Sequence, residues 1–169
     1  METEAMIDAV RDFLDADDWH YEFDAEHSVI RAGVTLRCKL KNARMFIRFR
    51  KTDYNVLMVA PISADPNNIG EVLRYTAQAN YGLASGNFEV DVTDGEIRYK
   101  SYVDCDGLET LPKEIFIDSI NACWAMMERY GNGYAALAMG FSDADAEYAK
   151  VRDKEVAPDD DDDPPADGD

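Results

Sequence analysis

Residues 29–40 of the chain read VIRAGVTLRCKL, and this alternation is the clearest structural pattern in the sequence. The even positions are apolar: Ile30, Ala32, Val34, Leu36, Cys38 and Leu40. Polar and basic residues occupy odd positions: Arg31, Thr35, Arg37 and Lys39. Successive side chains on a strand point to opposite faces, so a period of two predicts a strand with one face in the core and one face open.

A second alternating segment follows a short connection at residues 41–43. Met45, Ile47 and Phe49 are expected to face the core, and the residues between them to face outward: Arg44, Phe46, Arg48 and Arg50. If the two segments pair, one sheet face carries six bases together with Phe46: Arg31, Arg37, Lys39, Arg44, Arg48 and Arg50. The run VLMVAPI at residues 56–62 is apolar throughout and predicts a strand buried on both faces.

Helical patterns surround these strands. Apolar residues at helical spacing predict a helix over 3–18, and Trp19, Tyr21 and Phe23 then alternate as in a half-buried strand. Asp65-Pro66 predicts the start of a second helix, and Pro112 the start of a third. In the third helix, apolar residues share one stripe until two glycines, Gly131 and Gly133, are expected to interrupt it.

A hairpin is predicted between the second and third helices. Phe88, Val90 and Val92 alternate inward, Asp94-Gly95 supplies a two-residue turn, and the return strand contributes Ile97, Tyr99 and Val103. A type I′ turn at these two residues places Asp91 opposite Arg98 and Glu89 opposite Lys100. Both pairs are of opposite charge, which supports this register.

The order helix, three or four strands, helix, hairpin, helix predicts one α+β domain over residues 1–141. Its sheet is expected to be twisted and antiparallel, with helices flanking it. Residues 142–155 form a polar extension with the composition of a loose helix. Residues 156–169 are rich in Asp and Pro and predict a disordered acidic tail.

The charge of the chain limits its partners. It has 35 acidic and 17 basic residues and a formal net charge of -18, which argues against general affinity for nucleic acid. Asp outnumbers Glu by 23 to 12 and Lys occurs only 7 times, a balance that favours a halophilic source. An acidic N-terminus and the lack of any 18-residue apolar run predict no secretory signal, no membrane association and a cytoplasmic protein.

Residues 31–51 hold eight bases and no acid, in contrast to this acidic background. One interpretation is a docking face for an acidic protein segment or for phosphate, with Phe46 as an exposed aromatic beside guanidinium groups. Neutralisation within the chain, by an acidic helix or by the Asp-rich tail, is a second interpretation. A solvated sheet face is the third.

No pattern in the sequence predicts catalysis, a metal or a cofactor. Neither His20 nor His27 sits beside a cysteine or serine in a recognisable nucleophile setting, and no Gly-rich phosphate loop, zinc signature or nucleophile elbow is present. Residues 104–109 (DCDGLE) begin like a calcium loop but end too early to supply its ligands. Cys38 and Cys123 are expected in the core, and Cys105 near the surface.

Residues 79–82 (ANYG), 86–91 (GNFEVD) and 94–99 (DGEIRY) resemble the YbjN family, whose members share a helix ending near Asn, a Gly-x-Phe step and an Asp-Gly hairpin. The resemblance covers roughly residues 3–141. It implies a fold like that of type III secretion chaperones, often dimeric, and a candidate sensory-transduction regulator without defined catalytic residues. The matching residues are therefore interpreted structurally: Asn80, Gly86, Phe88 and Gly95.

These observations favour a non-enzymatic adaptor, regulator or chaperone that docks an acidic partner segment on the basic sheet face. The alternative is a sensor domain that binds a nucleotide or another phosphorylated small molecule on the same face.

Overall fold

The computed structural model describes residues 1–156, with side chains as far as residue 153. Along the chain the elements are α1 (Thr3–Ala16), β1 (Tyr21–Asp24), β2 (Val29–Thr35), β3 (Asn42–Phe49), β4 (Asp53–Ser63), α2 (Ile69–Asn80), β5 (Asn87–Val90), β6 (Glu96–Asp104), α3 (Lys113–Ala138) and α4 (Ala144–Val156). Apart from Val156, the predicted acidic tail lies outside the described residues.

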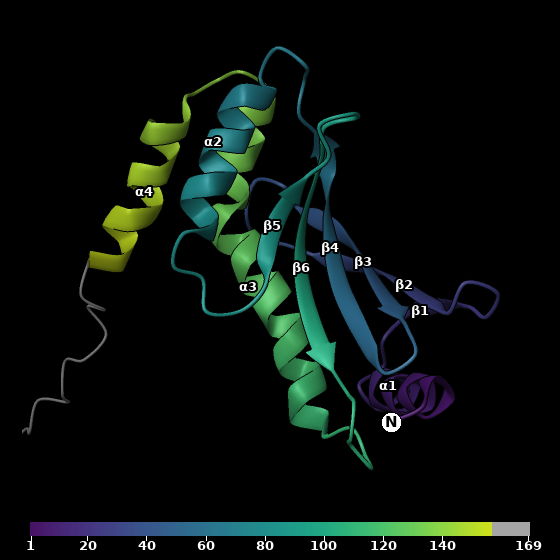
Figure 1. Ribbon diagram of the computed structural model, residues 1–169. Helices are drawn as coiled ribbons and strands as arrows, with labels where there is room; N and C mark the ends of the chain where they lie inside the picture. The colour runs from purple at the N-terminus through teal and green to yellow at the C-terminus, as the bar shows by residue number, and fades with distance from the viewer. Residues whose placement is uncertain (157–169) are drawn as a thin grey trace, which may run out of the picture.

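The strands form one antiparallel sheet in the order β1-β2-β3-β4-β6-β5. Helix α3 packs against β4 and β6, α2 against β5, and α1 against β3 (Figure 1). These helices share one hydrophobic core with the sheet, and they leave its other face open. The predicted α+β class with an antiparallel sheet and flanking helices is confirmed.

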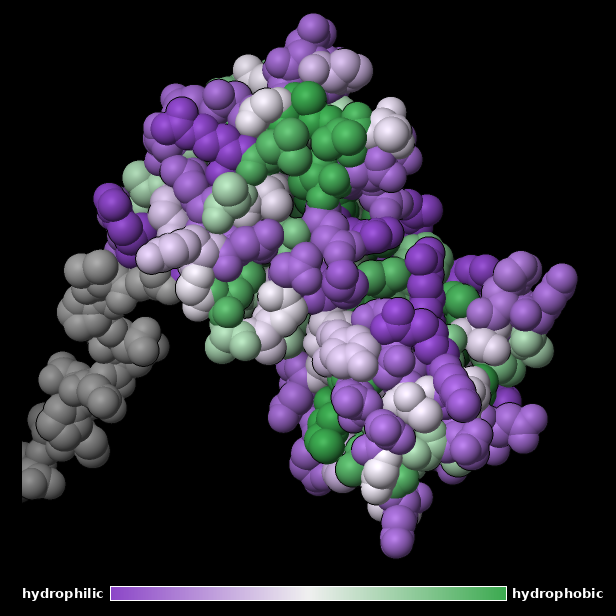
Figure 2. All heavy atoms as spheres, viewed as in Figure 1, coloured by the Kyte–Doolittle hydropathy of each residue, from purple (hydrophilic) through white to green (hydrophobic). Residues whose placement is uncertain are grey.

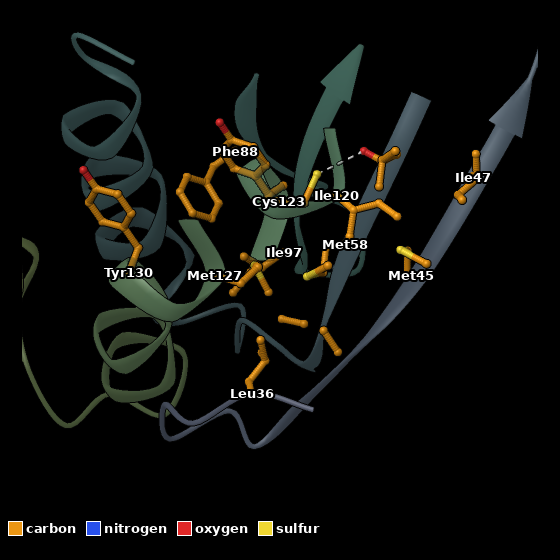
Figure 3. Packing of buried hydrophobic residues seen from close by; sticks show 14 of the residues in the cluster. Leu36, Met45, Ile47, Met58, Phe88, Ile97, Ile120, Cys123, Met127 and Tyr130 are labelled. Carbon is orange, nitrogen blue, oxygen red and sulfur yellow. Dashed lines mark hydrogen bonds between the residues drawn. The ribbon is translucent and has the colours of Figure 1, made fainter. Parts of the chain in front are cut away.

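The core forms between α3 and the inner face of the central strands. As predicted, the α3 stripe is buried: Phe116, Ile120, Cys123 and Met127. Figure 3 shows how side chains from α3 meet those of the strands, among them Met45, Met58 and Ile97. The Cys123 thiol donates to the Val56 carbonyl oxygen at 3.6 Å, and burial raises the pKa of this thiol to about 12. Burial of this apolar surface is the main force that holds the helices on the sheet.

The prediction of one continuous strand over residues 29–40 is wrong, because β2 ends at Thr35. The chain then turns, with the Leu36 N–H donating to the Lys41 carbonyl at 2.8 Å and Lys41 at a positive φ of 67°. Leu36, Cys38 and Leu40 are buried as predicted. Backbone N–H groups of the turn donate hydrogen bonds to side chains of α3, including Cys38 N to Glu128 Oε2 at 2.9 Å.

The prediction that Gly131 and Gly133 interrupt the third helix is wrong, since α3 continues through both residues to Ala138. A Cβ on Gly131 would lie 2.7 Å from the Cys38 Sγ, and one on Gly133 would lie 2.3 Å from the Tyr75 hydroxyl oxygen. The glycines therefore allow the turn at residues 36–41 and helix α2 to approach α3 closely. Their role is packing, which offsets the lower stability that glycine gives a helix.

The hairpin register differs from the prediction by two residues. Glu89 pairs with Arg98 and Asn87 with Lys100, and residues 91–95 form the connection in place of a two-residue turn. The Asp91 N–H donates to the Glu96 carbonyl at 2.9 Å, which closes this longer loop. A shift of two residues keeps each side chain on its face, so Phe88 remains buried, but Val92 is 65% exposed.

Two further predictions need correction. Cys105 was expected near the surface, but it is fully buried, and burial raises the pKa of its thiol. Helix α2 begins at Ile69 and not at Asp65, whose carboxylate accepts the Asn67 N–H at 2.8 Å in a turn before the helix.

The polar extension is a packed helix. The Ala144 N–H at the start of α4 donates to the Glu71 carboxylate of α2 at 2.8 Å, and Ala144 is fully buried. Arg74 of α2 bonds to Asp145 of α4 at 2.6 Å. In the described part of the chain, no helix is both long and apolar enough to cross a membrane.

Candidate functional site

The open face of the sheet presents three consecutive outward side chains of β3: Arg44, Phe46 and Arg48. We call these residues the β3 stripe. The guanidinium carbons of Arg44 and Arg48 lie 5.9 and 6.0 Å from the centroid of the Phe46 ring, within cation–π range. The predicted outward orientation of these three residues is confirmed by the burial of Met45 and Ile47 between them.

An apolar floor lies beside the β3 stripe on β4. Leu57 is the register partner of Phe46, and Val59 that of Arg44. Each is only 3% exposed, although both point to the open face. Their other neighbours in the sheet are Lys100 and Arg98 of β6, so long side chains flank them on both sides. Figure 2 accordingly shows a mostly hydrophilic surface over β3, β4 and β6, with small hydrophobic areas between.

The two arginines of the β3 stripe have no acidic partner among the side chains that the structure describes. Among the side chains that the structure describes, no Asp or Glu forms an ion pair with Arg44 or Arg48. Two other predicted site residues are neutralised locally. Arg31 bonds to Asp24 at 2.9 Å, and this bond is the largest cause that lowers the pKa of Asp24 to about 2.

Arg50 is the second neutralised base. It lies just beyond β3, bonds to the Asp53 carboxylate at 2.6 Å, and stacks over Tyr102 of β6 with its guanidinium carbon 5.8 Å from the ring centroid. It therefore reaches the rim of the open face.

Arg37 and Lys39 are not on the open face, contrary to the prediction. Both lie in the turn at residues 36–41, against α3. The Arg37 guanidinium is 5.9 Å from the centroid of the Trp124 ring, and the Lys39 N–H donates to the Asn132 side chain at 2.8 Å. Because β2 ends early, the alternating residues beyond it pack against α3 and do not extend the strand.

A hollow of about 610 Å³ opens beside the β3 stripe, and the sequence analysis did not find it. Its lining residues come from β1, β2, β3 and the residue before β1: His20, Tyr21, Glu22, Arg31, Ala32, Gly33, Arg44, Met45 and Phe46. A Cβ on Gly33 would meet nothing within 4 Å, so the missing side chain leaves this space open. A glycine inside an alternating strand was the signal in the sequence.

Metal-ligand clusters and exposed thiols are lacking in the part of the chain that the structure describes. No three His, Cys, Asp or Glu residues there cluster in a way that could hold a metal ion. The thiols of Cys38, Cys105 and Cys123 are buried, and burial raises the pKa of each. Thiols of this kind are poor nucleophiles at neutral pH.

The residues interpreted structurally at the hairpin do have structural roles. The Asn80 side chain pairs with the backbone of Phe88, accepting its N–H at 2.7 Å and donating to its carbonyl at 3.0 Å. Phe88 is 2% exposed and meets Tyr99, Tyr130 and Tyr134. Gly95 has a φ of 76°, and a Cβ there would lie 2.3 Å from the Ala64 carbonyl oxygen.

Comparison with known proteins agrees with this fold. A family model described as "YbjN: Putative bacterial sensory transduction regulator" matches residues 7–132. The crystal structure of YbjN from E. coli, described as "a putative transcription regulator", superposes with a TM-score of 0.59 at 10% sequence identity, covering 77% of this chain and 91% of that one. At this identity the likeness concerns the fold. No curated protein matches the sequence.

Proposed function

The chain belongs to the YbjN family, and on that premise we propose that it is a non-enzymatic regulator that docks an acidic segment of a protein partner on the β3 stripe. The observation that carries this proposal is the pair Arg44 and Arg48. Both are without an acidic partner among the described side chains, in a chain of net charge -18.

Electrostatic complementarity supports an acidic partner. The net charge repels acidic molecules over most of the surface, so a local group of unneutralised guanidinium groups is where such a partner can approach. Guanidinium groups form paired hydrogen bonds with carboxylates, which adds direction to the attraction. Arg31 and Arg50 contribute less, because each must first exchange a carboxylate that it already binds.

Apolar contact supplies the rest of the proposed surface. Phe46 stands between the two arginines, and Leu57 and Val59 lie beside it on β4. Aromatic and arginine side chains dominate the binding energy of many protein interfaces. We therefore expect the partner segment to combine carboxylates with at least one apolar side chain.

Affinity capture from the lysate of the source organism, at its native salt, tests the proposal. The bait is the full chain as wild type, as Arg44→Gln/Arg48→Gln, and as the control Arg74→Gln/Lys113→Gln. The control changes the net charge equally but alters bases in exposed ion pairs on helices, with Asp145 and Asp17.

We expect wild type and control to enrich the same defined protein, and the β3 stripe variant to lose it. Equal enrichment by all three baits would contradict the proposal, because the docking surface would then lie elsewhere.

A further inference from the structure

We propose that the hollow over Gly33 binds a phosphorylated small molecule with a planar ring, of the nucleoside monophosphate class. The site combines unneutralised positive charge, an aromatic wall and a cavity of suitable size, and each of these rests on a separate observation.

One of the residues that line the hollow has no side chain. On the open face of β2, Arg31 and Thr35 flank Gly33, which faces Arg44 across the strand pair. Gly33 does not adopt a positive φ, and a Cβ would meet nothing within 4 Å. Neither backbone conformation nor packing therefore requires glycine here, and glycine weakens a strand interior. What its missing side chain does provide is the opening of the hollow.

The walls of the hollow suit a phosphate group. Arg44, which has no acidic partner among the described side chains, and Arg31, already bonded to Asp24, both line it. Guanidinium groups bind phosphate oxygens in pairs of hydrogen bonds. His20 lines the same hollow and is exposed, so it can donate a further hydrogen bond.

The remaining walls suit a ring. Phe46 offers an aromatic surface on which a base can stack if it displaces a guanidinium group, since those of Arg44 and Arg48 lie 5.9 and 6.0 Å from the ring centroid. Among the described residues, Glu22 is the single acid that lines the hollow, and its carboxylate can accept hydrogen bonds from amino or hydroxyl groups of a ligand. The volume of about 610 Å³ lies within the range of small-molecule sites, roughly 300–1,000 Å³. The hollow is also larger than the space that a single acidic side chain of a protein partner would fill.

This ligand would share two residues with the proposed docking surface. Arg44 and Phe46 belong both to the β3 stripe and to the hollow, so bound nucleotide and bound partner would compete. The competition rests on the proposed function, whereas the binding of the small molecule does not.

Isothermal titration calorimetry of the full chain with AMP, GMP, CMP and UMP tests the binding. Two kinds of control are used: ribose 5-phosphate, which lacks the planar base, and the four nucleosides, which lack the phosphate. We expect at least one nucleotide to bind with a Kd on the order of micromolar, and both of its halves to bind at least about tenfold more weakly. No binding by any of the four at millimolar concentration, or equal binding by ribose 5-phosphate, would overturn the proposal.

Two variants locate the site. Gly33→Val places a branched side chain on the floor of the hollow, where an added Cβ meets nothing within 4 Å, and we expect it to fold at least as stably as wild type while weakening nucleotide binding at least about tenfold. Unchanged affinity in Gly33→Val would also overturn the proposal. Arg48 does not line the hollow, so Arg48→Gln should retain nucleotide binding while it weakens partner capture. Failure of the ligand site and failure of the docking surface therefore give different results.

Discussion

The β3 stripe and the hairpin of β5 and β6 place similar side chains on the same open sheet face, but their charges are arranged differently. In the hairpin, the Glu89 carboxylate bonds to both bases of β6, to Arg98 at 2.8 Å and also to Lys100. In the β3 stripe, neither arginine meets an acid of the described side chains. The number of bases on a strand therefore does not separate the two regions, and the proposed docking surface is distinguished by bases that lack an acidic partner among the described side chains.

The two regions also differ in what they do for the fold. The hairpin carries residues on which the resemblance to the family was predicted, and it is held by Asn80 and by aromatic side chains of α3. The β3 stripe contributes outward side chains only, while the inward residues of the same strand build the core. We expect changes in the hairpin to reduce stability and changes in the β3 stripe to reduce binding.

The largest difference is expected between two phenylalanines. Phe88→Ala removes a ring that is 2% exposed and packed against three tyrosines, and it should reduce the free energy of unfolding by about 3–5 kcal/mol. Phe46→Ala, on the open face, should reduce it by less than about 1 kcal/mol. Urea unfolding followed by circular dichroism measures both, and equal losses would show that Phe46 is part of the fold.

The next effect concerns the link between α2 and the hairpin. Asn80→Ala leaves the backbone N–H of Phe88 without its side-chain acceptor, whereas the Phe88 carbonyl keeps the Asn87 side-chain amide at 3.2 Å, and we expect a loss of about 1–3 kcal/mol in the same unfolding experiment. Asn80→Asp keeps an acceptor for the N–H but removes the donor, so it should lie between wild type and Asn80→Ala. Full stability of Asn80→Ala would contradict this role.

A smaller effect should appear as a dependence on pH. Partial burial alone would raise the pKa of Glu89, but hydrogen bonds from Lys100 and Arg98 outweigh it and lower the pKa below the usual 4.5. A lowered pKa in the folded state stabilises the protein above the unfolded value, and this contribution is lost as pH falls below about 4.5. The stability difference between wild type and Glu89→Gln should therefore shrink on acidification, measured as urea midpoints from pH 7 to pH 3. A constant difference would contradict the pairing.

The smallest effect on stability is expected from the acidic tail. Its deletion (residues 158–169) should leave the melting temperature unchanged, measured by differential scanning calorimetry at native salt, because this segment contains only Asp, Pro, Ala and Gly and so has no large apolar side chain to bury. Partner capture by the shortened chain tests the alternative that the tail neutralises the basic face. Stronger capture and a weaker salt dependence of stability would support that alternative.

The sequence was informative where the pattern depends on local periodicity. Alternation predicted which residues of β3 face the core and which face outward, and helical spacing predicted the buried stripe of α3 from Phe116 to Met127. The Asp-Gly pair marked the hairpin, although its register was wrong, since the loop runs from 91 to 95. A two-residue shift keeps each side chain on its face of the sheet and cannot be detected from periodicity.

Long-range contacts account for what could not be predicted. Leu36, Cys38 and Leu40 continue the alternation of β2, but α3 and not a strand partner buries them. Gly131 and Gly133 read as breaks because glycine disfavours helices, and only contact with Cys38 and Tyr75 explains them. The local ion pairs of Arg31 and Arg50, and the hollow over Gly33, also depend on the register of neighbouring strands. Dimer formation, a chaperone-like activity and a halophilic source stay predictions.

The most direct test measures both regions in both assays. Arg44→Gln/Arg48→Gln and Arg98→Gln/Lys100→Gln change the net charge equally on one sheet face, and each is compared with wild type for its urea midpoint and for partner capture. We predict that the first variant keeps its stability within about 0.5 kcal/mol and loses capture. The second should lose about 1 kcal/mol, because Glu89 is left without its partners, and keep capture. Loss of capture in the second variant with retention in the first would contradict the assignment of the docking surface to the β3 stripe.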